Sequence, residues 1–262
     1  MDLHVTDAGA GTPVLLLHGL TATHRYVVMG SRTLERSGHR VIAYDARGHG
    51  ASDPAPDGVY DSAALAADLL GVMDARGVDR AVLAGASMGA HTILRVAMDA
   101  PERVAGLVVI TPAYDPVDSA SPETLARWDA LADGLEQGGV EGFVAAYDVA
   151  TVPEAWRETI TTVLRQRLSA HEHPEAVADA IRGVPRSQPF ATLHDHARVE
   201  APTVVVADRD EADPGHPLSV GEAYAELIPG ADLVVEEPGR SPIAWQGGQL
   251  SKVIAGVAAR AG

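Results

Sequence analysis

A serine lies between two glycines in the segment Gly85-Ala86-Ser87-Met88-Gly89. A short apolar run, Ala81 to Ala84, precedes this segment, and residues with helical spacing, His91 to Met98, follow it. A strand, a sharp turn and a helix form the context that a nucleophile elbow requires. Small neighbours are needed because the serine takes a strained backbone conformation, which pushes its hydroxyl out to a helix N-terminus. The segment therefore predicts Ser87 as a nucleophile; the alternative is a tight turn with a capping serine.

The elements that must position this serine alternate between short apolar runs and longer segments with helical spacing. Runs that read as strands are Val14 to His18, Arg40 to Asp45, Arg80 to Ala84, Val104 to Ile110, Thr203 to Ala207 and Leu233 to Val235. Apolar runs separated by helices are typical of a parallel sheet that is covered on both faces and connected by right-handed crossovers. A final helix is expected from about Gln249 to Ala259. The predicted fold class is α/β, with a mostly parallel central sheet flanked by helices.

The strand pattern is interrupted in the middle of the chain. From about Pro116 to His196 the sequence is rich in Ala, Glu, Asp and Arg, and helix starts are expected at Ser121-Pro122-Glu123 and Val152-Pro153-Glu154. We therefore predict a catalytic core made of residues 1–115 and 197–262, with residues 116–196 inserted as a helical cap.

Composition excludes several classes of protein. The 262 residues suit one domain, 46% of them are hydrophobic, and the formal net charge is −16. This charge argues against nucleic-acid binding, which needs a basic face. There is no cysteine, so thiolate catalysis, disulfides and cysteine-type zinc sites are excluded. No membrane helix is expected, and residues 1–11 do not read as a secretory signal, so a cytoplasmic location is predicted.

At this point the sequence resembles the α/β-hydrolase family, and most closely its bacterial esterase, lactonase and perhydrolase-like members. The resemblance rests on motifs that occur in the family's order and span nearly the whole chain: Leu17-His18-Gly19-Leu20, Asp45-Ala46-Arg47-Gly48-His49-Gly50-Ala51-Ser52, the Ser87 elbow and Ala207-Asp208-Arg209-Asp210. Serine at the nucleophile position argues against the haloalkane dehalogenase and epoxide hydrolase branches, which use aspartate there.

The resemblance implies a role for each matching position. Ser87 would be the nucleophile, and the backbone N–H groups of Leu20 and Met88 would form the oxyanion hole. Asp210 would be the acid of the triad, with Asp208 as its rival. The same motifs contain two further histidines that we interpret as hydrogen-bonded scaffold residues, His18 and His49.

The family's catalytic histidine should follow the last strand, and there the pattern departs from the family. The turn reads Glu237-Pro238-Gly239-Arg240-Ser241-Pro242, with Arg240 in the histidine position, and no histidine occurs after His216. A guanidinium stays protonated and has no acceptor site, so Arg240 cannot be the general base. It could pair with Asp210, or hold a carboxylate or phosphate of the substrate bidentately.

A substitute base has to come from elsewhere in the chain. His216 is the first candidate, because it lies six residues beyond Asp210 at an expected helix start; the alternative is a capping or surface histidine. Other candidates are His24 and the pairs His171/His173 and His194/His196. The H-x-H spacing of these pairs could suggest metal ligands, but the surroundings read as helix or loop, so no metal is predicted.

Three functions remain open on these residues. The first is a serine hydrolase of a small ester, lactone or thioester, with an atypical or absent general base. The second is a non-hydrolytic enzyme, such as a lyase, an isomerase or one with cofactor-free oxygen chemistry, in which Arg240 holds an anionic group. The third is a ligand-binding pseudoenzyme. The expected partner is a small-molecule substrate; no organic cofactor is predicted, because no G-x-G-x-x-G fingerprint is present.

Overall fold

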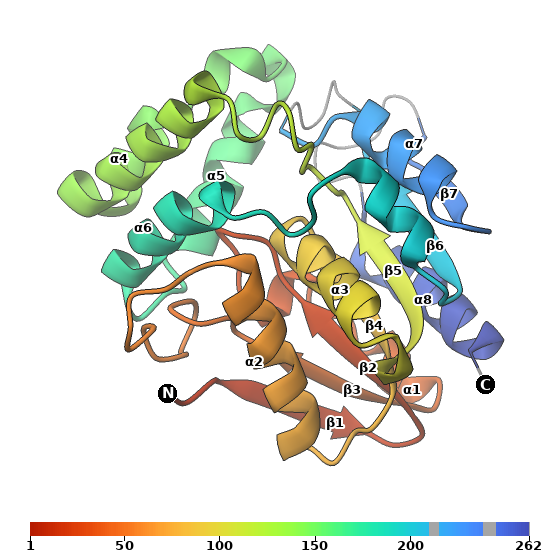
Figure 1. The fold of residues 1–262 in the computed structure, drawn as a ribbon. Coiled ribbons are helices and arrows are strands. Elements are labelled where there is room, and N and C mark those ends of the chain that lie inside the picture. Colours follow the sequence, from red (N-terminus) through yellow and green to blue (C-terminus); the bar gives the residue numbers. More distant parts are fainter. Residues whose placement is uncertain (210–214, 238–244, 262) are drawn as a thin grey trace.

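A central seven-stranded sheet organises the computed structural model, which describes residues 1–209, 215–237 and 245–261. The strand order is β1-β3-β2-β4-β5-β6-β7, and all neighbours are parallel except β1 and β3 (Figure 1). The strands are β1 (Val5–Gly9), β2 (Thr12–Leu17), β3 (His39–Tyr44), β4 (Ala81–Ala86), β5 (Val104–Ile110), β6 (Thr203–Ala207) and β7 (Asp232–Val235). The α/β prediction is confirmed, and so are the predicted strand positions to within a few residues.

Strand β1 was not predicted. Its sequence, Val5-Thr6-Asp7-Ala8-Gly9, is mostly exposed, because the strand lies at the edge of the sheet and pairs only with β3. An edge strand of this kind has no buried apolar run for a pattern to detect.

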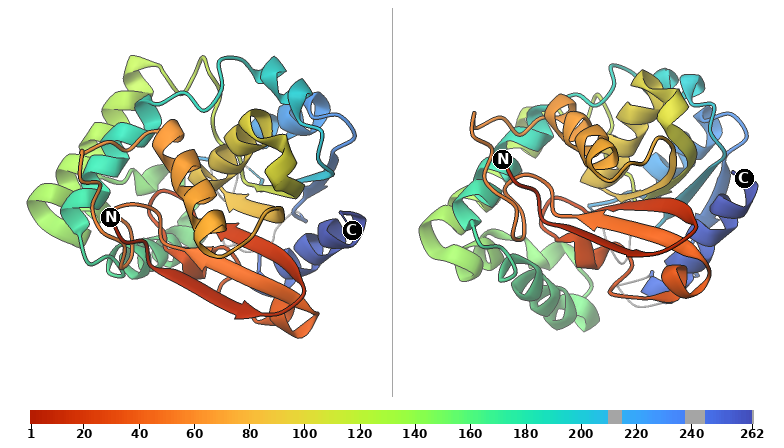
Figure 2. Two further views of the ribbon diagram at one scale, coloured as in Figure 1. Left: turned by 60° about the horizontal axis from the view of Figure 1, so that its bottom comes forward. Right: turned by 90° about the horizontal axis from the view of Figure 1, so that it is seen from below.

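Helices cover both faces of the sheet, as the two turned views show (Figure 2). The helices are α1 (Thr33–Arg36), α2 (Ser62–Ala75), α3 (Met88–Asp99), α7 (Leu218–Leu227) and α8 (Gly247–Arg260). Alternate residues of β2 divide between the faces: Leu15 and Leu17 pack with α2, α3 and α7, whereas Val14 and Leu16 pack with α1 and α8. This period-2 division is expected of a strand that is buried on both faces.

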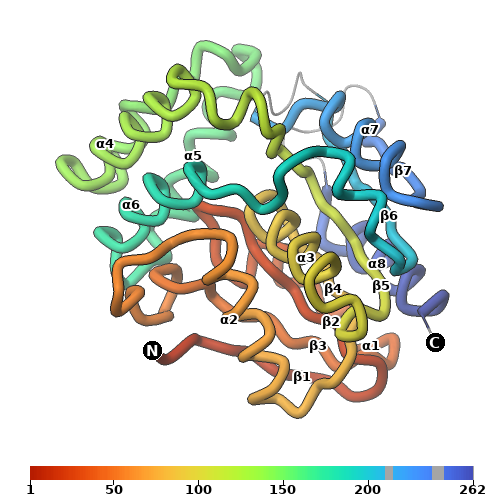
Figure 3. Tube along the Cα trace, in the orientation of Figure 1, coloured from red at the N-terminus to blue at the C-terminus, as the bar shows by residue number. Residues whose placement is uncertain are grey.

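The chain between β5 and β6 forms a helical insertion, whose path is traced in Figure 3. Its helices are α4 (Pro122–Ala146), α5 (Arg157–Leu168) and α6 (Pro174–Gly183). Short 3-10 turns lie between α4 and α5 and after α6. The Ser121 hydroxyl caps α4 by accepting a hydrogen bond from Thr124 N, as the sequence predicted for this helix start. At the second predicted start, a 3-10 turn over Glu154–Trp156 comes first and α5 begins at Arg157.

Apolar side chains of the insertion pack onto residues that follow the strands of the core. Phe143, Leu168 and Val177 belong to one buried cluster with Leu20 and Met88. The insertion therefore lies against the two residues whose amides the sequence assigned to an oxyanion hole. No helix among the described residues combines the length and the apolarity that crossing a bilayer requires.

Candidate active site

Ser87 lies on a sharp turn between β4 and α3. Its backbone has φ 50° and ψ −110°, a left-handed conformation that is rare for a residue with a side chain. The two glycines of the motif allow this turn. A Cβ on Gly85 would lie 2.2 Å from the carbonyl oxygen of Gly89, and a Cβ on Gly89 would lie 2.4 Å from that of Leu17. The helix begins directly at Met88, three residues earlier than its sequence pattern indicated.

The two candidate oxyanion amides lie on segments that the fold brings beside Ser87. Met88 is the first residue of α3, and the first amides of a helix have no intrahelical acceptor. On the other side, a Cβ built on Gly19 would lie 3.4 Å from the Ser87 Cβ, so the turn that leads into Leu20 lies against the serine. Gly89 N donates to the His18 carbonyl at 3.1 Å and ties the two segments together.

A ring nitrogen of His216 lies within hydrogen-bond distance of the serine hydroxyl. The distance from His216 Nε2 to Ser87 Oγ is 2.9 Å, across 129 positions of the sequence. His216 is half-buried and lies just before α7, in the connection that follows β6. In the family pattern the histidine follows the last strand instead. The described part of the chain contains no other histidine with a hydrogen bond to Ser87 Oγ.

The other candidate bases have different surroundings. His24 Nδ1 bonds to Asp45 Oδ1 at 2.8 Å, and His173 lies 3.5 Å from Glu175. His194 is exposed. His196 is fully buried among Phe190 and Tyr224, and this burial lowers the pKa of His196 to about 4.

His18 is a buried, neutral ring beside the turn at Gly19. Its Nε2 accepts a hydrogen bond from Ala46 N at 2.9 Å, so the proton lies on Nδ1, which donates to the Gly19 carbonyl at 2.8 Å. Burial, together with the neighbouring His49, lowers the pKa of His18 to about 3. This geometry agrees with a scaffold role.

The turn after Leu20 is held by three further side chains. His49 places its ring nitrogens 2.6 Å from the Leu20 carbonyl and 2.8 Å from that of Arg47. Asp45 Oδ1 accepts a hydrogen bond from His24 N at 2.7 Å.

His171, which belongs to the helical insertion, is the third of these side chains. It accepts a hydrogen bond from Gly50 N at 2.8 Å through Nδ1 and donates from Nε2 to the Thr21 carbonyl at 3.3 Å. Burial lowers the pKa of His171 to about 4, so it stays neutral near pH 7. The role of His171 in linking the insertion to this turn was missed from the sequence, where only its H-x-H spacing stood out.

His91 is a further residue that the sequence did not single out. It lies one helical turn beyond Ser87, and its Nε2 accepts hydrogen bonds from Ala113 N at 3.3 Å and Tyr114 N at 3.1 Å. Burial, together with the neighbouring His216, lowers the pKa of His91 to about 3. The loop after β5 is therefore tied to the helix that carries the serine.

Two of the predicted site residues, Asp210 and Arg240, lie outside the residues that the structure describes. The rival acid, Asp208, directly follows β6 and is buried, with 8% of its surface exposed.

Comparison with known proteins extends the similarity over nearly the whole chain. A sequence model of the family described as alpha/beta hydrolase fold matches residues 12–247. The 2-hydroxy-6-oxononadienedioate/2-hydroxy-6-oxononatrienedioate hydrolase 2 of Pseudomonas putida is 31% identical over 248 residues, which cover 90% of this chain and 83% of that protein.

Solved structures agree with this match. A thermophilic esterase from Thermogutta terrifontis, with malate bound, superposes with a TM-score of 0.81 at 28% identity, covering 99% of this chain and 93% of that one. Est816, an N-acyl homoserine lactone degrading enzyme, gives a TM-score of 0.71 at 25% identity and covers 97% of this chain and 94% of that one. Together with the sheet order and the turn at Ser87, these matches show that the protein is a hydrolase of the α/β-hydrolase fold family.

Proposed function

We propose that the protein hydrolyses a small ester, lactone or thioester through nucleophilic attack by Ser87, with His216 as the general base. The observation that carries this proposal is the 2.9 Å distance between His216 Nε2 and Ser87 Oγ. A general base has to lie within hydrogen-bond reach of the proton that it abstracts. The strained turn at Ser87 and the similarity to an esterase and a lactone-degrading enzyme support the same chemistry.

The reaction follows the order of a serine hydrolase. Ser87 Oγ attacks the carbonyl carbon while its proton moves to His216 Nε2. The negative charge that develops on the carbonyl oxygen is stabilised by the amides of Leu20 and Met88. His216 then gives the proton to the leaving alcohol or thiol, and the acyl group stays bound to Ser87 Oγ as an ester. In the second half, His216 takes a proton from water, the hydroxide attacks the acyl carbon, and the acid leaves as the proton returns to Ser87. Asp210, with Asp208 as its rival, is the proposed acid that orients His216.

Arg240 has no place as a base in this reaction, and we assign it to an anionic group of the substrate or to an ion pair with Asp210. A carboxylate on the substrate is supported by the relative from Pseudomonas putida, whose named substrate is a dioate. Esters with and without a second carboxylate therefore form the substrate panel, and Arg240→Ala is expected to impair only the carboxylate-bearing members.

A fluorophosphonate probe tests the nucleophile. The wild-type protein should be labelled on Ser87, and Ser87→Ala should not be labelled. Labelling that is equal in both proteins, or absent from both, contradicts the proposal.

Restoring a histidine at position 240 tests the base. If His216 already serves, Arg240→His leaves the hydrolysis of an activated ester unchanged. A gain of orders of magnitude would mean that the wild-type protein lacks a working base, and this result would favour the pseudoenzyme.

A further inference from the structure

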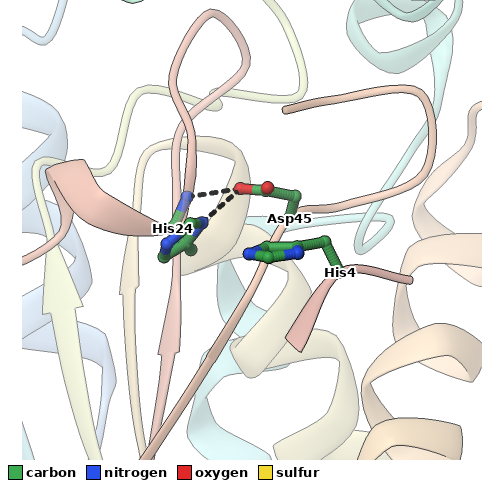
Figure 4. Close-up of side chains that lie close together, drawn as sticks. All are labelled: His4, His24 and Asp45. Atoms are coloured by element: carbon green, nitrogen blue, oxygen red, sulfur yellow. Dashed lines mark hydrogen bonds and ion pairs between the residues drawn. The ribbon is translucent and has the colours of Figure 1, made fainter. Parts of the chain in front are cut away.

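Two imidazoles and a carboxylate, those of His4, His24 and Asp45, lie close together. His4 lies just before β1, His24 begins a 3-10 turn after β2, and Asp45 follows β3. The ligand atoms that these residues offer all lie within 4.8 Å of one another (Figure 4). Within the described ranges, this is the one group of at least three such side chains that comes this close.

The backbone around each of the three residues is already fixed by hydrogen bonds. His4 N donates to Ser52 Oγ at 2.8 Å, and the His4 carbonyl accepts from Asp45 N at 3.0 Å. His24 N donates to Asp45 Oδ1 at 2.7 Å, while Ala51 N donates to Asp45 Oδ2 at 3.2 Å. The cluster is therefore organised before any ion arrives, and little chain entropy is lost on binding.

The donor set selects a class of ion. Two imidazole nitrogens with one carboxylate suit zinc and its first-row neighbours, whereas magnesium and calcium prefer oxygen ligands alone. Ligand atoms that are each about 2.1 Å from such an ion lie roughly 3.0–3.4 Å apart. His24 Nδ1 and Asp45 Oδ1, at 2.8 Å, are close to this spacing.

His4 supplies the adjustable ligand. Its ring centre is 5.1 Å from that of His24, and the two planes are tilted by 46°. Its ring atoms have to move closer to the other two ligands when an ion binds, and the chain contains many more acidic than basic residues, which favours a cation.

The cluster has a buried side and a side that is open to solvent. The side chain of Asp45 is 2% exposed and that of His24 is 25% exposed, so one side of the group reaches solvent. Three protein ligands and a water molecule would complete a tetrahedral site there.

We propose that His4, His24 and Asp45 bind a zinc-class divalent ion, which joins the amino-terminal segment to the turn that follows the oxyanion residue Leu20. The ion takes no part in the proposed hydrolysis, because the site involves neither Ser87 nor His216.

The test measures metal binding by the full chain after treatment with a chelator. Zn²⁺ affinity is obtained by competition with a chromophoric chelator, and Co²⁺ is added separately, because its visible absorption reports nitrogen ligands and coordination geometry. The key variant is His4→Ala, since no described hydrogen bond depends on the His4 ring. The matched control is His194→Ala, which removes an exposed histidine elsewhere.

We expect one Zn²⁺ per chain in the wild-type protein, in the control and in Ser87→Ala. We expect the dissociation constant to rise by more than about 100-fold in His4→Ala, because even residues behind the ligands change affinity by about 10- to 100-fold. His4→Ala should keep the wild-type circular dichroism spectrum. A wild-type protein without a stoichiometric site, or a His4→Ala variant that binds as tightly as the wild type, overturns the proposal. Ser87→Ala separates the two proposals, because it abolishes hydrolysis without touching the metal ligands.

Discussion

Replacing His171 should slow catalysis even though this residue lies in the helical insertion. Its ring accepts a hydrogen bond from Gly50 N and donates one to the carbonyl of Thr21, which is the neighbour of Leu20, a proposed oxyanion residue. In His171→Leu both bonds are lost, and the part-buried amide of Gly50 loses its acceptor. Leaving one such group unsatisfied costs about 1–3 kcal/mol.

If this free energy is lost entirely from the stabilisation of the transition state, kcat/KM drops by about 5- to 150-fold. The upper limit is set by the loss of one whole oxyanion donor, which is worth roughly 10²–10³ in kcat. Because oxyanion donors act mainly in the transition state, the loss should appear in kcat rather than in KM. His171→Asn, which keeps an acceptor near the Nδ1 position, should recover part of it.

The assay is the steady-state hydrolysis of an activated ester well below the melting temperature of each variant. His173→Leu is the matched control, since His173 comes from the same H-x-H pair but lies beside Glu175, partly exposed. An equal effect of the two replacements, or a loss confined to KM, would refute the link between the insertion and the oxyanion turn.

Further predictions concern the stability of the core. Gly89→Ala places a Cβ 2.4 Å from a backbone carbonyl of β2, so it should lower the free energy of unfolding by about 3 kcal/mol and abolish labelling by a fluorophosphonate. Unchanged urea unfolding would contradict this. Asp68→Ala leaves the buried guanidinium of Arg47 without its bidentate partner and should cost about 3–5 kcal/mol, measured by urea unfolding against wild type. The pKa values of His18 and His91 are about 3 in the folded chain, whereas an ordinary histidine has a pKa of 6.5. The unfolded state therefore takes up more protons below pH 6.5, so stability falls as the pH falls. For these two residues the loss between pH 8 and pH 5 is ~4 kcal/mol, and urea midpoints that do not move over this range would contradict it.

The sequence was informative where a feature depends on neighbouring residues. The alternation of apolar runs and helical segments predicted the parallel strands, and the glycines around Ser87 predicted a turn that the structure shows at φ 50°. Edge strand β1 was not predicted, because only one of its edges pairs with another strand and most of its residues are exposed.

Features that join distant segments could not be predicted in the same way. His216 could be named as a candidate, but its approach to Ser87 spans 129 positions and depends on how β6 and α7 are connected. The pair His171/His173 illustrates the same limit, since one residue holds two backbone groups and the other lies beside a glutamate. The roles of Asp210 and Arg240, the division of the chain at residues 116–196 and the cytoplasmic location stay predictions.

The most direct test of the central claim is the rate at which Ser87 is acylated in a His216→Gln variant. Stopped-flow mixing with a p-nitrophenyl ester measures the acylation burst, with His194→Gln as the control for an exposed histidine. If His216 is the base, acylation should slow by about 10⁴-fold or more, as for the loss of a triad member, while the control keeps the wild-type rate. A His216→Gln variant that acylates within about tenfold of wild type would contradict the assignment of His216.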